Sequence, residues 1–435
     1  MTESNRKIFI HVFGCRSSIC EGEYIAGVLK FHDFEITEDI NGEYKAAVIV
    51  TCSVTQEADR KCRQAVRRAR RVLGDKGVVA VCGCWAQSLD KNSAQELGID
   101  ILAGSKGKDI LPYKLIDMLE NDETQHSFLD LRTHDIFSPY ESQWEELEIS
   151  SPVLHSRAFM KIQDGCDHFC TYCVIPFLRG RPVSRPKEKI ISEIQRLLDN
   201  GTKEIIFTGI HLGLYGRDID SSLADLISEV SKIKKLKRLR LGSLEPFCLD
   251  EKLLNALSEC EAFCHHLHLP LQSGSDEILN LMRRGYSAKD FVELCYNARK
   301  KISDKIHISS DILVGFPGEK EKDFNATLTV MQDAGLGRVH VFPYSERPGT
   351  LAAKIPGKIH HDIKISRTSM AIAFGRELYD KYARNFLGRK VEILIEKNSK
   401  GYTRHYVEAV CSDGGSENEI LKAKVLRYVN NRLEC

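Results

Sequence analysis

The segment GCDHFCTYC, residues 165–173, places Cys166, Cys170 and Cys173 four and then three positions apart. Thiolates on one loop can hold three corners of an iron–sulfur cube. The fourth iron would then stay open for a small molecule, much as a catalytic zinc keeps an open position. A structural zinc site completed by a distant His is one alternative, and three buried structural cysteines are another.

A second set of cysteines is spread over the amino-terminal part of the chain. Cys15 lies in FGCRSS, Cys52 in VTCSVT and Cys84 in CGCWAQ, each at the end of a short apolar run. If these runs are parallel strands, the three thiols meet at one rim of the sheet, where open α/β sheets bind ligands. Three free buried thiols are the alternative. We expect Cys20 and Cys62 in helices and Cys82 in the core of a strand.

The elements that must position these cysteines fall into an α/β fold class with three parts. The amino-terminal part is predicted to be a parallel α/β domain with strands at 7–14, 45–51 and 77–83 and a helix over 56–73. The central part alternates strands with helices, which predicts a partial (βα)6 barrel. Its strands are expected at 158–163, 204–209, 237–243, 264–271, 307–314 and 338–343, and its helices at 187–200, 222–234, 249–260, 274–300 and 320–335.

The carboxyl-terminal part alternates apolar and polar residues between Gly and Asn breaks, which predicts a small antiparallel β-barrel. Polar, acidic sequence between the first two parts indicates a linker. The predicted domains are 1–135, a linker at 136–156, 157–380 and 384–435. Ser275 is expected to cap the helix that begins after it.

Composition narrows the class of protein. The chain has 435 residues, 62 Lys and Arg against 61 Asp and Glu, and 15 cysteines. A net charge near zero means that any nucleic-acid contact must come from local basic patches. The sequence shows no secretory start and no long apolar span, so we expect a cytoplasmic protein that contacts no membrane and keeps its thiols reduced.

The spacing Cys-x3-Cys-x2-Cys after the first barrel strand, with Tyr172 before the last Cys, resembles the radical S-adenosylmethionine enzymes. In that superfamily the open iron binds the methionine moiety of the cofactor. Reduction of the cluster then cleaves the cofactor to a 5′-deoxyadenosyl radical, which removes hydrogen from a carbon. The resemblance is specific for the superfamily and does not name the substrate.

The amino-terminal cysteine segments resemble those of the methylthiotransferases, whose patterns are fGC, NTCxVT and GCxAQ. Residue 51 is Thr where Asn is usual. The segments 267–286, 311–319 and 344–352 agree with the same family. The segments 388–396 and 401–406 resemble the TRAM module. The resemblance covers nearly the whole chain.

The resemblance implies two [4Fe–4S] clusters and S-adenosylmethionine as cofactors. Cys15, Cys52 and Cys84 would hold an auxiliary cluster, and Cys166, Cys170 and Cys173 would hold the radical-forming one. One cofactor molecule would methylate a sulfur on the auxiliary cluster, and a second would generate the radical that prepares the substrate carbon. No catalytic residue beyond the cluster ligands is assigned.

Further cofactor contacts are expected at the ends of the barrel strands. Gly209 would let the backbone approach closely, and Ser243 and Glu245 could hydrogen-bond the ribose or amine. Glu245 could alternatively pair with Arg240. Gln272 is a polar group in an apolar run, and an aromatic such as Phe342 could pack on adenine. Candidate cofactor-binding residues are therefore Tyr172, Gly209, Ser243, Glu245, Gln272 and Phe342.

Three substrates are known for the family that the sequence resembles. FTGIHLGLYGRD, from residue 207, most resembles the branch that acts on N6-threonylcarbamoyladenosine 37 of tRNA, where TGxHxGxYG is usual. The alternatives are isopentenyladenosine 37 of tRNA and an aspartate of a ribosomal protein. A non-catalytic RNA-binding protein that stores clusters is a more distant alternative.

The helix expected over 56–73 carries a basic face that could track phosphates. A solvated face without a partner is the alternative. The candidate RNA-binding residues are Arg60, Arg63, Arg67, Arg68 and Arg71. The expected partners are a tRNA anticodon stem-loop and a reductase or flavodoxin-type electron donor, and the protein is expected to be a monomer.

Overall fold

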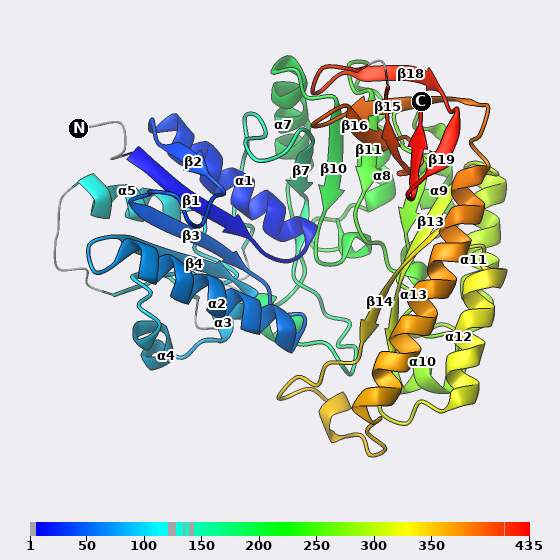
Figure 1. Ribbon diagram of the computed structural model, residues 1–435, viewed down its shortest axis with the longest axis horizontal. Helices are drawn as coiled ribbons and strands as arrows, with labels where there is room; N and C mark the ends of the chain where they lie inside the picture. Colours follow the sequence, from blue (N-terminus) through cyan, green and yellow to red (C-terminus); the bar gives the residue numbers. More distant parts are fainter. Residues whose placement is uncertain (1–5, 121–127, 134, 139–142, 413) are drawn as a thin grey trace. The chain divides into compact units, whose positions relative to one another are not determined.

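The computed structural model describes residues 6–120, 128–133, 135–138, 143–412 and 414–435 (Figure 1). Contacts between residues divide the chain into two compact units. Unit 1 comprises Met1–His168 and Cys173–Asn200, and unit 2 comprises Phe169–Tyr172 and Gly201–Cys435. Among the described residues, no helix is long and apolar enough to cross a membrane.

Unit 1 is built on a parallel sheet in the order β2-β1-β3-β4-β5-β6. Every residue of β3 and β4 is buried, as their apolar runs predict for strands covered on both faces. The predicted strands of this part are thus confirmed as β1, β3 and β4. The strands are β1 (Lys7–Val12), β2 (Glu35–Thr37), β3 (Ala46–Thr51), β4 (Val78–Gly83), β5 (Ile101–Leu102) and β6 (Leu129–Asp130).

Helices cover both faces of this sheet. Alternate residues of the strands pack on α1 (Arg16–Phe31) and α5 (Leu111–Glu120). The opposite set packs on α2 (Gln56–Leu73) through Cys62, Ala65, Val66 and Ala69. The short helices α3 (Cys84–Ser88) and α4 (Lys91–Glu96) follow β4. The helix predicted over 56–73 is confirmed, and Cys20, Cys62 and Cys82 lie in α1, α2 and β4, all buried.

Unit 1 also holds the segments on either side of the cysteine-rich loop. They are β7 (Ala158–Lys161), β8 (Gln163–Asp164), α6 (Ile175–Arg179), β9 (Val183–Ser184) and α7 (Lys187–Asp199). The described part of the acidic segment before them, 136–138 and 143–156, contains no helix or strand. Its Leu147 and Ile149 are nevertheless buried.

Unit 2 contains the remaining strands of the partial barrel, all paired in parallel. Bridges Leu239↔Phe263 and Ser243↔His268 continue the parallel arrangement from β11 to β12. The strands are β10 (Glu204–Thr208), β11 (Arg238–Leu241), β12 (His266–His268), β13 (His307–Val314) and β14 (Arg338–Pro343). They alternate with α8 (Leu223–Val230), α9 (Glu251–Glu259), α10 (Asp276–Met282), α11 (Ala288–Lys301) and α12 (Glu321–Asp333), while the 24-residue α13 (His361–Arg384) runs along β14 (Figure 1).

Two details of the segment around Ser275 differ from the sequence-based expectation. The helix expected over 274–300 is two helices, α10 and α11, because Arg283 and Gly285 adopt positive φ angles of 60° and 72°. Ser275 stands at the N-cap position of α10 as predicted, but its hydroxyl donates to Asp323 Oδ1 at 2.7 Å instead of capping the helix.

The carboxyl-terminal sheet has the order β18-β15-β16-β17-β20-β19. Its described pairs are antiparallel, as expected, except that β17 and β20 pair in parallel. The strands are β15 (Lys390–Ile395), β16 (Lys400–Thr403), β17 (Glu408–Val410), β18 (Ile420–Lys424), β19 (Arg427–Val429) and β20 (Arg432–Glu434).

Backbone carbonyls of this sheet accept hydrogen bonds from the amino ends of the barrel strands. Arg238 donates to the carbonyl of Tyr402 at 3.0 Å, and Arg240 donates to that of Thr403 at 3.1 Å. Both arginines also pair with Glu204, at 2.6 and 2.9 Å. All three charged side chains are fully buried, so the ion pairs and the carbonyls together satisfy groups that have no access to water.

Candidate functional site

Cys15, Cys52 and Cys84 follow three adjacent strands of the unit 1 sheet. Cys15 comes after β1 as the N-cap residue of α1, Cys52 directly follows β3, and Cys84 begins α3 after β4. Because β1, β3 and β4 are neighbours and parallel, all three thiols stand at the same end of the sheet. Cys15 is exposed, whereas Cys52 and Cys84 are buried.

Gly14 brings Cys15 close to Cys52. Its φ of +108° is one that residues with side chains rarely adopt, and a Cβ at this position would lie 2.7 Å from the Cβ of Cys52. Only glycine fits such an approach without displacing a neighbour. The glycine in FGCRSS is therefore required by close packing against Cys52, next to the cysteine that it precedes.

Burial keeps two of these thiols, Cys52 and Cys84, protonated in the absence of a cation. Burial raises the pKa of Cys52 to about 12, and negative charge on Cys15 or Cys84 would raise it further. Burial also raises the pKa of Cys84. A metal centre deprotonates the thiols that it binds. Three mutually repelling thiolates at one rim thus fit a cationic group such as the iron–sulfur core of a cluster.

One arginine contacts this thiol set. Arg179, at the end of α6, donates from Nε to Cys84 Sγ at 3.1 Å and is itself buried. Arg179 was not among the residues predicted from the sequence. The sequence around Arg179 indicates its role only by its position six residues after Cys173. The contact to Cys84 joins residues 95 positions apart and leaves no local pattern.

The loop that carries Cys166 and Cys173 is closed at its base. Strand β8 pairs with β9, and the Cys166 amide donates to the carbonyl of Gly180 at 3.1 Å. Gly165 has a φ of +75°, and a Cβ there would lie 2.0 Å from the carbonyl oxygen of Arg181. Glycine is therefore required where the chain enters the loop.

The middle of the loop, Phe169–Tyr172, is anchored within unit 2. Thr171 donates from its amide to the Met282 carbonyl at 3.2 Å and from its hydroxyl to the Leu281 carbonyl at 2.8 Å. Tyr172 packs against the apolar cluster that includes Phe316 and Tyr344. These contacts hold the chain next to Cys170, which directly precedes Thr171.

A second buried arginine contacts Cys170. Arg284 Nη1 lies 3.5 Å from Cys170 Sγ and 3.2 Å from Glu245 Oε1. Burial raises the pKa of Cys170, while the Arg284 charge lowers it. The suggested pairing of Glu245 with Arg240 is wrong, because Arg240 pairs with Glu204. The sequence placed Glu245 near the cofactor but gave no indication of Arg284.

The other predicted cofactor contacts stand at the ends of barrel strands in unit 2. Gly209 directly follows β10, and Ser243 is bridged to His268 beyond the end of β11. Gln272 has a φ of +66°, which is uncommon for a residue with a long side chain and is a form of strain found at functional sites. Phe342, in β14, is 44% exposed. Their roles toward the cofactor remain predictions.

Among the described residues, no three His, Cys, Asp or Glu side chains converge closely enough to hold a single metal ion. An iron–sulfur cube distributes its protein thiolates over different iron atoms. The three thiols that hold such a cube are therefore spaced more widely than the ligands of a single metal ion.

The segment FTGIHLGLYG lies at the carboxyl end of β10. It forms a 3₁₀ turn, η2 (Leu212–Leu214), in which a Cβ on Gly213 would meet Cys248 Sγ at 2.3 Å. The ring of His211 lies 5.7 Å from that of Phe247. The turn therefore packs on Phe247 and Cys248, which directly follow the loop that carries Ser243 and Glu245, at the carboxyl end of β10.

The basic helix α2 presents most of its arginines outward. The predicted residues Arg60, Arg63, Arg67, Arg68 and Arg71 are all exposed, while the apolar face of the helix is buried. Arg60 pairs with Glu57 at 2.5 Å, which partly neutralises it. Arg63 lies over the ring of Trp85 at 5.9 Å.

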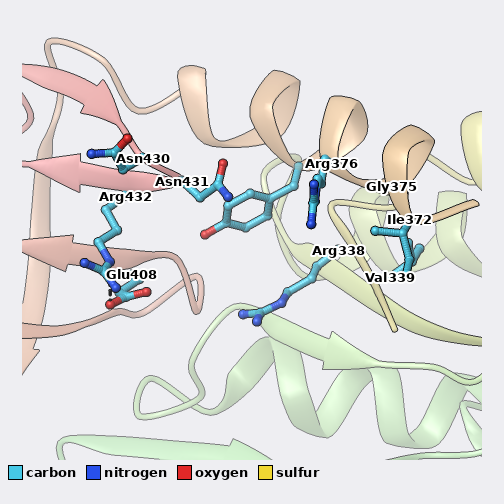
Figure 2. A pocket seen from close by; sticks show the side chains of 10 residues that line it. Arg338, Val339, Ile372, Gly375, Arg376, Glu408, Asn430, Asn431 and Arg432 are labelled. Atoms are coloured by element: carbon cyan, nitrogen blue, oxygen red, sulfur yellow. Dashed lines mark ion pairs between the residues drawn. The ribbon is translucent and has the colours of Figure 1, made fainter. Parts of the chain in front are cut away.

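Unit 2 has a second basic surface, a pocket of about 350 Å³ between α13, β14 and the carboxyl-terminal sheet. Figure 2 shows Arg338, Arg376 and Arg432 around it, with Asn430 and Asn431 on the adjoining turn. Arg432 pairs with Glu408 at 2.8 Å. Within the described part of the chain, Arg338 and Arg376 form no ion pair. The pocket therefore offers unneutralised guanidinium groups to an anion such as phosphate.

Two family descriptions match parts of the chain. Residues 160–331 match the Radical SAM superfamily, and residues 7–104 match Uncharacterized protein family UPF0004. The first range contains all three cysteines of the loop and the second contains Cys15, Cys52 and Cys84. The two thiol sets thus fall in separately recognised regions.

Relatives match over nearly the full length. The chain is 34% identical to threonylcarbamoyladenosine tRNA methylthiotransferase MtaB of Bacillus subtilis (strain 168), over 97% of this chain and 94% of that protein. It is 33% identical to tRNA-2-methylthio-N(6)-dimethylallyladenosine synthase of Syntrophus aciditrophicus (strain SB), over 91% of this chain and 85% of that protein.

A solved structure supports the fold. The radical S-adenosylmethionine methyltransferase TsrM from Kitasatospora setae, with cobalamin and a [4Fe–4S] cluster bound, superposes with a TM-score of 0.57. The match covers 78% of this chain and 75% of that one at 17% identity. At this identity the likeness shows a shared architecture.

Proposed function

Since the chain belongs to the tRNA methylthiotransferases of the radical S-adenosylmethionine superfamily, we propose that it adds a methylthio group to C2 of N6-threonylcarbamoyladenosine at position 37 of tRNA. The family uses S-adenosylmethionine and two [4Fe–4S] clusters. When bound, these groups supply the sulfur, the methyl group and the one-electron chemistry. The residues of this chain hold them, orient them and admit the nucleoside.

The proposal assigns the two thiol sets to the two clusters. Cys15, Cys52 and Cys84 hold the auxiliary cluster, since the sheet gathers them at one end and one of them is open to solvent. Cys166, Cys170 and Cys173 hold the cluster that binds S-adenosylmethionine. Each set supplies three ligands and so leaves one iron for another molecule.

The cofactor binds along the carboxyl ends of the barrel strands in unit 2, beside Tyr172, Gly209, Ser243, Gln272 and Phe342. Glu245 contributes in two ways. It holds Arg284 against Cys170, and its carboxylate is partly exposed, so it can also accept from a ligand hydroxyl or amine. Such groups at strand ends are where parallel α/β folds place their ligand contacts.

The observation that carries the substrate is the position of the segment His211–Gly216. It is the segment that resembles the threonylcarbamoyl branch, and it packs on Phe247 and Cys248, shortly after Ser243 and Glu245, at the carboxyl end of the strands. A segment there can contact the N6 substituent of the base. The full-length relative named for the threonylcarbamoyl substrate supports the same assignment.

Two basic surfaces are suited to the phosphates of the tRNA. Helix α2 presents five exposed arginines, and the pocket of Figure 2 adds Arg338 and Arg376. Contacts to phosphate fix position without reading sequence. Bases in an anticodon loop are unstacked easily, so admitting one to the site costs little. We expect a cytoplasmic enzyme that acts as a monomer with a flavodoxin-type electron donor.

The second candidate substrate is isopentenyladenosine 37, because relatives named for dimethylallyladenosine match at nearly the same identity. Mass analysis of tRNA nucleosides from cells lacking the gene separates the two. Loss of 2-methylthio-N6-threonylcarbamoyladenosine, restored by the wild-type chain, is the expected result. Loss of the isopentenyl form would select the second candidate, and unchanged tRNA would redirect the search to a ribosomal protein.

A further inference from the structure

Arg179 belongs to the segment that follows the radical-forming cysteines, yet it contacts a cysteine of the other set. It lies six residues after Cys173, at the end of α6, and its Nε donates to Cys84 Sγ at 3.1 Å. Both residues are in unit 1. The Arg179 side chain is fully buried, so this contact is not exchanged for one with water.

The guanidinium group is held from its other side by two carboxylates. Nη1 donates to Glu21 Oε1 at 2.9 Å and to Asp164 Oδ1 at 3.0 Å. A guanidinium carries its donors in a rigid plane. With one edge fixed by Glu21 and Asp164, the Nε–H direction toward Cys84 is fixed as well.

These groups are part of a larger set of buried charges in unit 1. Lys161 pairs with Asp164 at 3.0 Å, and Lys108 pairs with Glu145 at 3.1 Å and Glu21 at 3.6 Å. Three acids and three bases balance within the set, which consists of Glu21, Lys108, Glu145, Lys161, Asp164 and Arg179. Burying so many charges is expensive and contributes little to stability by comparison with apolar packing. Such a network therefore points to a functional demand.

The functional role of the network is indicated by Cys84, which Arg179 contacts in addition to the carboxylates. A neutral thiol is a weak hydrogen-bond acceptor, whereas a cluster-bound thiolate is an anion that forms a charge-assisted bond. Hydrogen bonds to ligand sulfurs and nearby positive charge set the potential and the retention of iron–sulfur clusters. The geometry of Arg179 matches that role.

We propose that Arg179 is a positioning residue of the auxiliary cluster, which fixes Cys84 and offsets the negative charge of the cluster, so that the cluster is retained and its midpoint potential is raised. The inference rests on the proposed function in one respect, namely that Cys15, Cys52 and Cys84 hold a cluster. It adds that the segment from Cys173 to Arg179 serves both thiol sets.

The experiment uses the full chain with Cys166, Cys170 and Cys173 replaced by Ala, so that only the auxiliary cluster can form. In this parent we compare Arg179→Gln, Arg179→Lys and the control Arg185→Gln. Arg185 is also buried in unit 1, and its charge pairs with the carboxylates of Glu146 and Glu193. The readouts are iron and sulfide per chain, loss of cluster to a chelator, midpoint potential and thermal unfolding by circular dichroism.

We expect Arg179→Gln to lower the midpoint potential and to weaken cluster retention by about 10- to 100-fold, the range for groups that support metal ligands. Arg179→Lys keeps the charge but loses the planar donor, so its potential should lie between those of the parent and Arg179→Gln. Arg185→Gln should keep the parent potential even where it lowers the unfolding temperature.

Parent-like potentials in the Arg179 variants would overturn the inference, and so would an equal shift in Arg185→Gln. If Arg179→Gln does not fold, Arg179→Lys is used alone, and a parent-like midpoint potential in that variant overturns the inference. A parent that binds no cluster at all overturns the cluster assignment and this inference together. A parent that binds a cluster whose potential does not depend on Arg179 overturns this inference alone.

Discussion

The two thiol sets differ in how the chain brings them together. Cys15, Cys52 and Cys84 are far apart in sequence and meet because three adjacent strands end at one rim. Cys166, Cys170 and Cys173 are neighbours in sequence, and their loop is shaped by hydrogen bonds at its base and middle. The first site depends on the whole sheet, whereas the second depends on a few anchoring hydrogen bonds.

Despite this difference, both sets have a buried arginine against one thiol. Arg179 lies 3.1 Å from Cys84 and Arg284 lies 3.5 Å from Cys170. Arg179 is held by two carboxylates from other elements, and Arg284 is held by one. The comparison indicates that the chain supports each set in a similar way, although it gathers the thiols by different routes.

The largest expected effect separates the two sites by function. Cys15→Ser should abolish methylthiolation but leave reductive cleavage of S-adenosylmethionine intact, because the loop cysteines are untouched. Cys170→Ser should abolish both. The measurement is release of 5′-deoxyadenosine with dithionite, alongside methylthio product from tRNA. Cleavage that disappears in Cys15→Ser would contradict the separation.

The next effect tests the support of Cys170. Glu245→Gln leaves the buried Arg284 without its carboxylate, and breaking such a pair should lower the free energy of unfolding by about 3 kcal/mol. Glu229→Gln is the control, because Glu229 pairs with the exposed Lys232 and such surface pairs contribute about 1 kcal/mol or less. Urea unfolding of both variants measures the difference. Equal losses would show that Arg284 is satisfied without Glu245.

A smaller effect concerns the RNA surfaces. Charge reversal of Arg67, Arg68 and Arg71 should weaken tRNA binding and reduce the slope of log K against log salt by about one for each phosphate that the variant no longer binds. Arg376→Glu should act in the same direction in unit 2. Lys300→Glu, an exposed reversal on α11, is the control. Filter binding at several salt concentrations measures this, and an unchanged slope would exclude the surface concerned.

The smallest effect is a difference in acid sensitivity between the units. Burial lowers the pKa of His307 and His405 in unit 2 to about 3. Between about pH 6.5 and pH 3 these imidazoles are protonated in the unfolded chain but neutral in the folded one. Unit 2 therefore loses stability as the pH falls from about 6.5 toward 3. In unit 1, burial would raise the pKa of Glu21, but Arg179 and Lys108 lower it to about 2. Its stabilising contribution is lost only below the ordinary value of 4.5.

The two tryptophans, Trp85 and Trp144, both lie in unit 1. In an acid titration, circular dichroism should therefore change at higher pH than tryptophan fluorescence. His307→Gln should bring the two transitions closer. Coincident transitions in the wild-type chain would show that the units lose their structure together.

Sequence patterns identified what is local or periodic. The buried strands follow from runs such as that of β3, and the meeting of Cys15, Cys52 and Cys84 follows from parallel pairing. The break between α10 and α11 was missed because a single glycine, Gly285, is not a decisive stop in a helical pattern and the positive φ of Arg283 has no sequence signature. Helix α13 was missed because its residues are mostly exposed and carry little apolar periodicity.

The two supporting arginines could not be predicted for a different reason. Arg179 and Arg284 stand in basic segments, RGR and RRG, that read as surface sequence. Their burial depends on carboxylates contributed by distant elements, such as Glu21 for Arg179 and Glu245 for Arg284. Only the folded chain brings these groups within reach.

The bonds from Arg238 and Arg240 to the carboxyl-terminal sheet have a consequence for how this protein can diverge. Most of them end on the main-chain carbonyls of Tyr402, Thr403 and Arg404, which every amino acid possesses, and one ends on the Glu392 side chain. Most side chains of that sheet can therefore change while these backbone bonds to the barrel persist. Removing the sheet would instead leave two buried guanidinium groups without these carbonyl acceptors. The last strands are therefore required for unit 2 to fold.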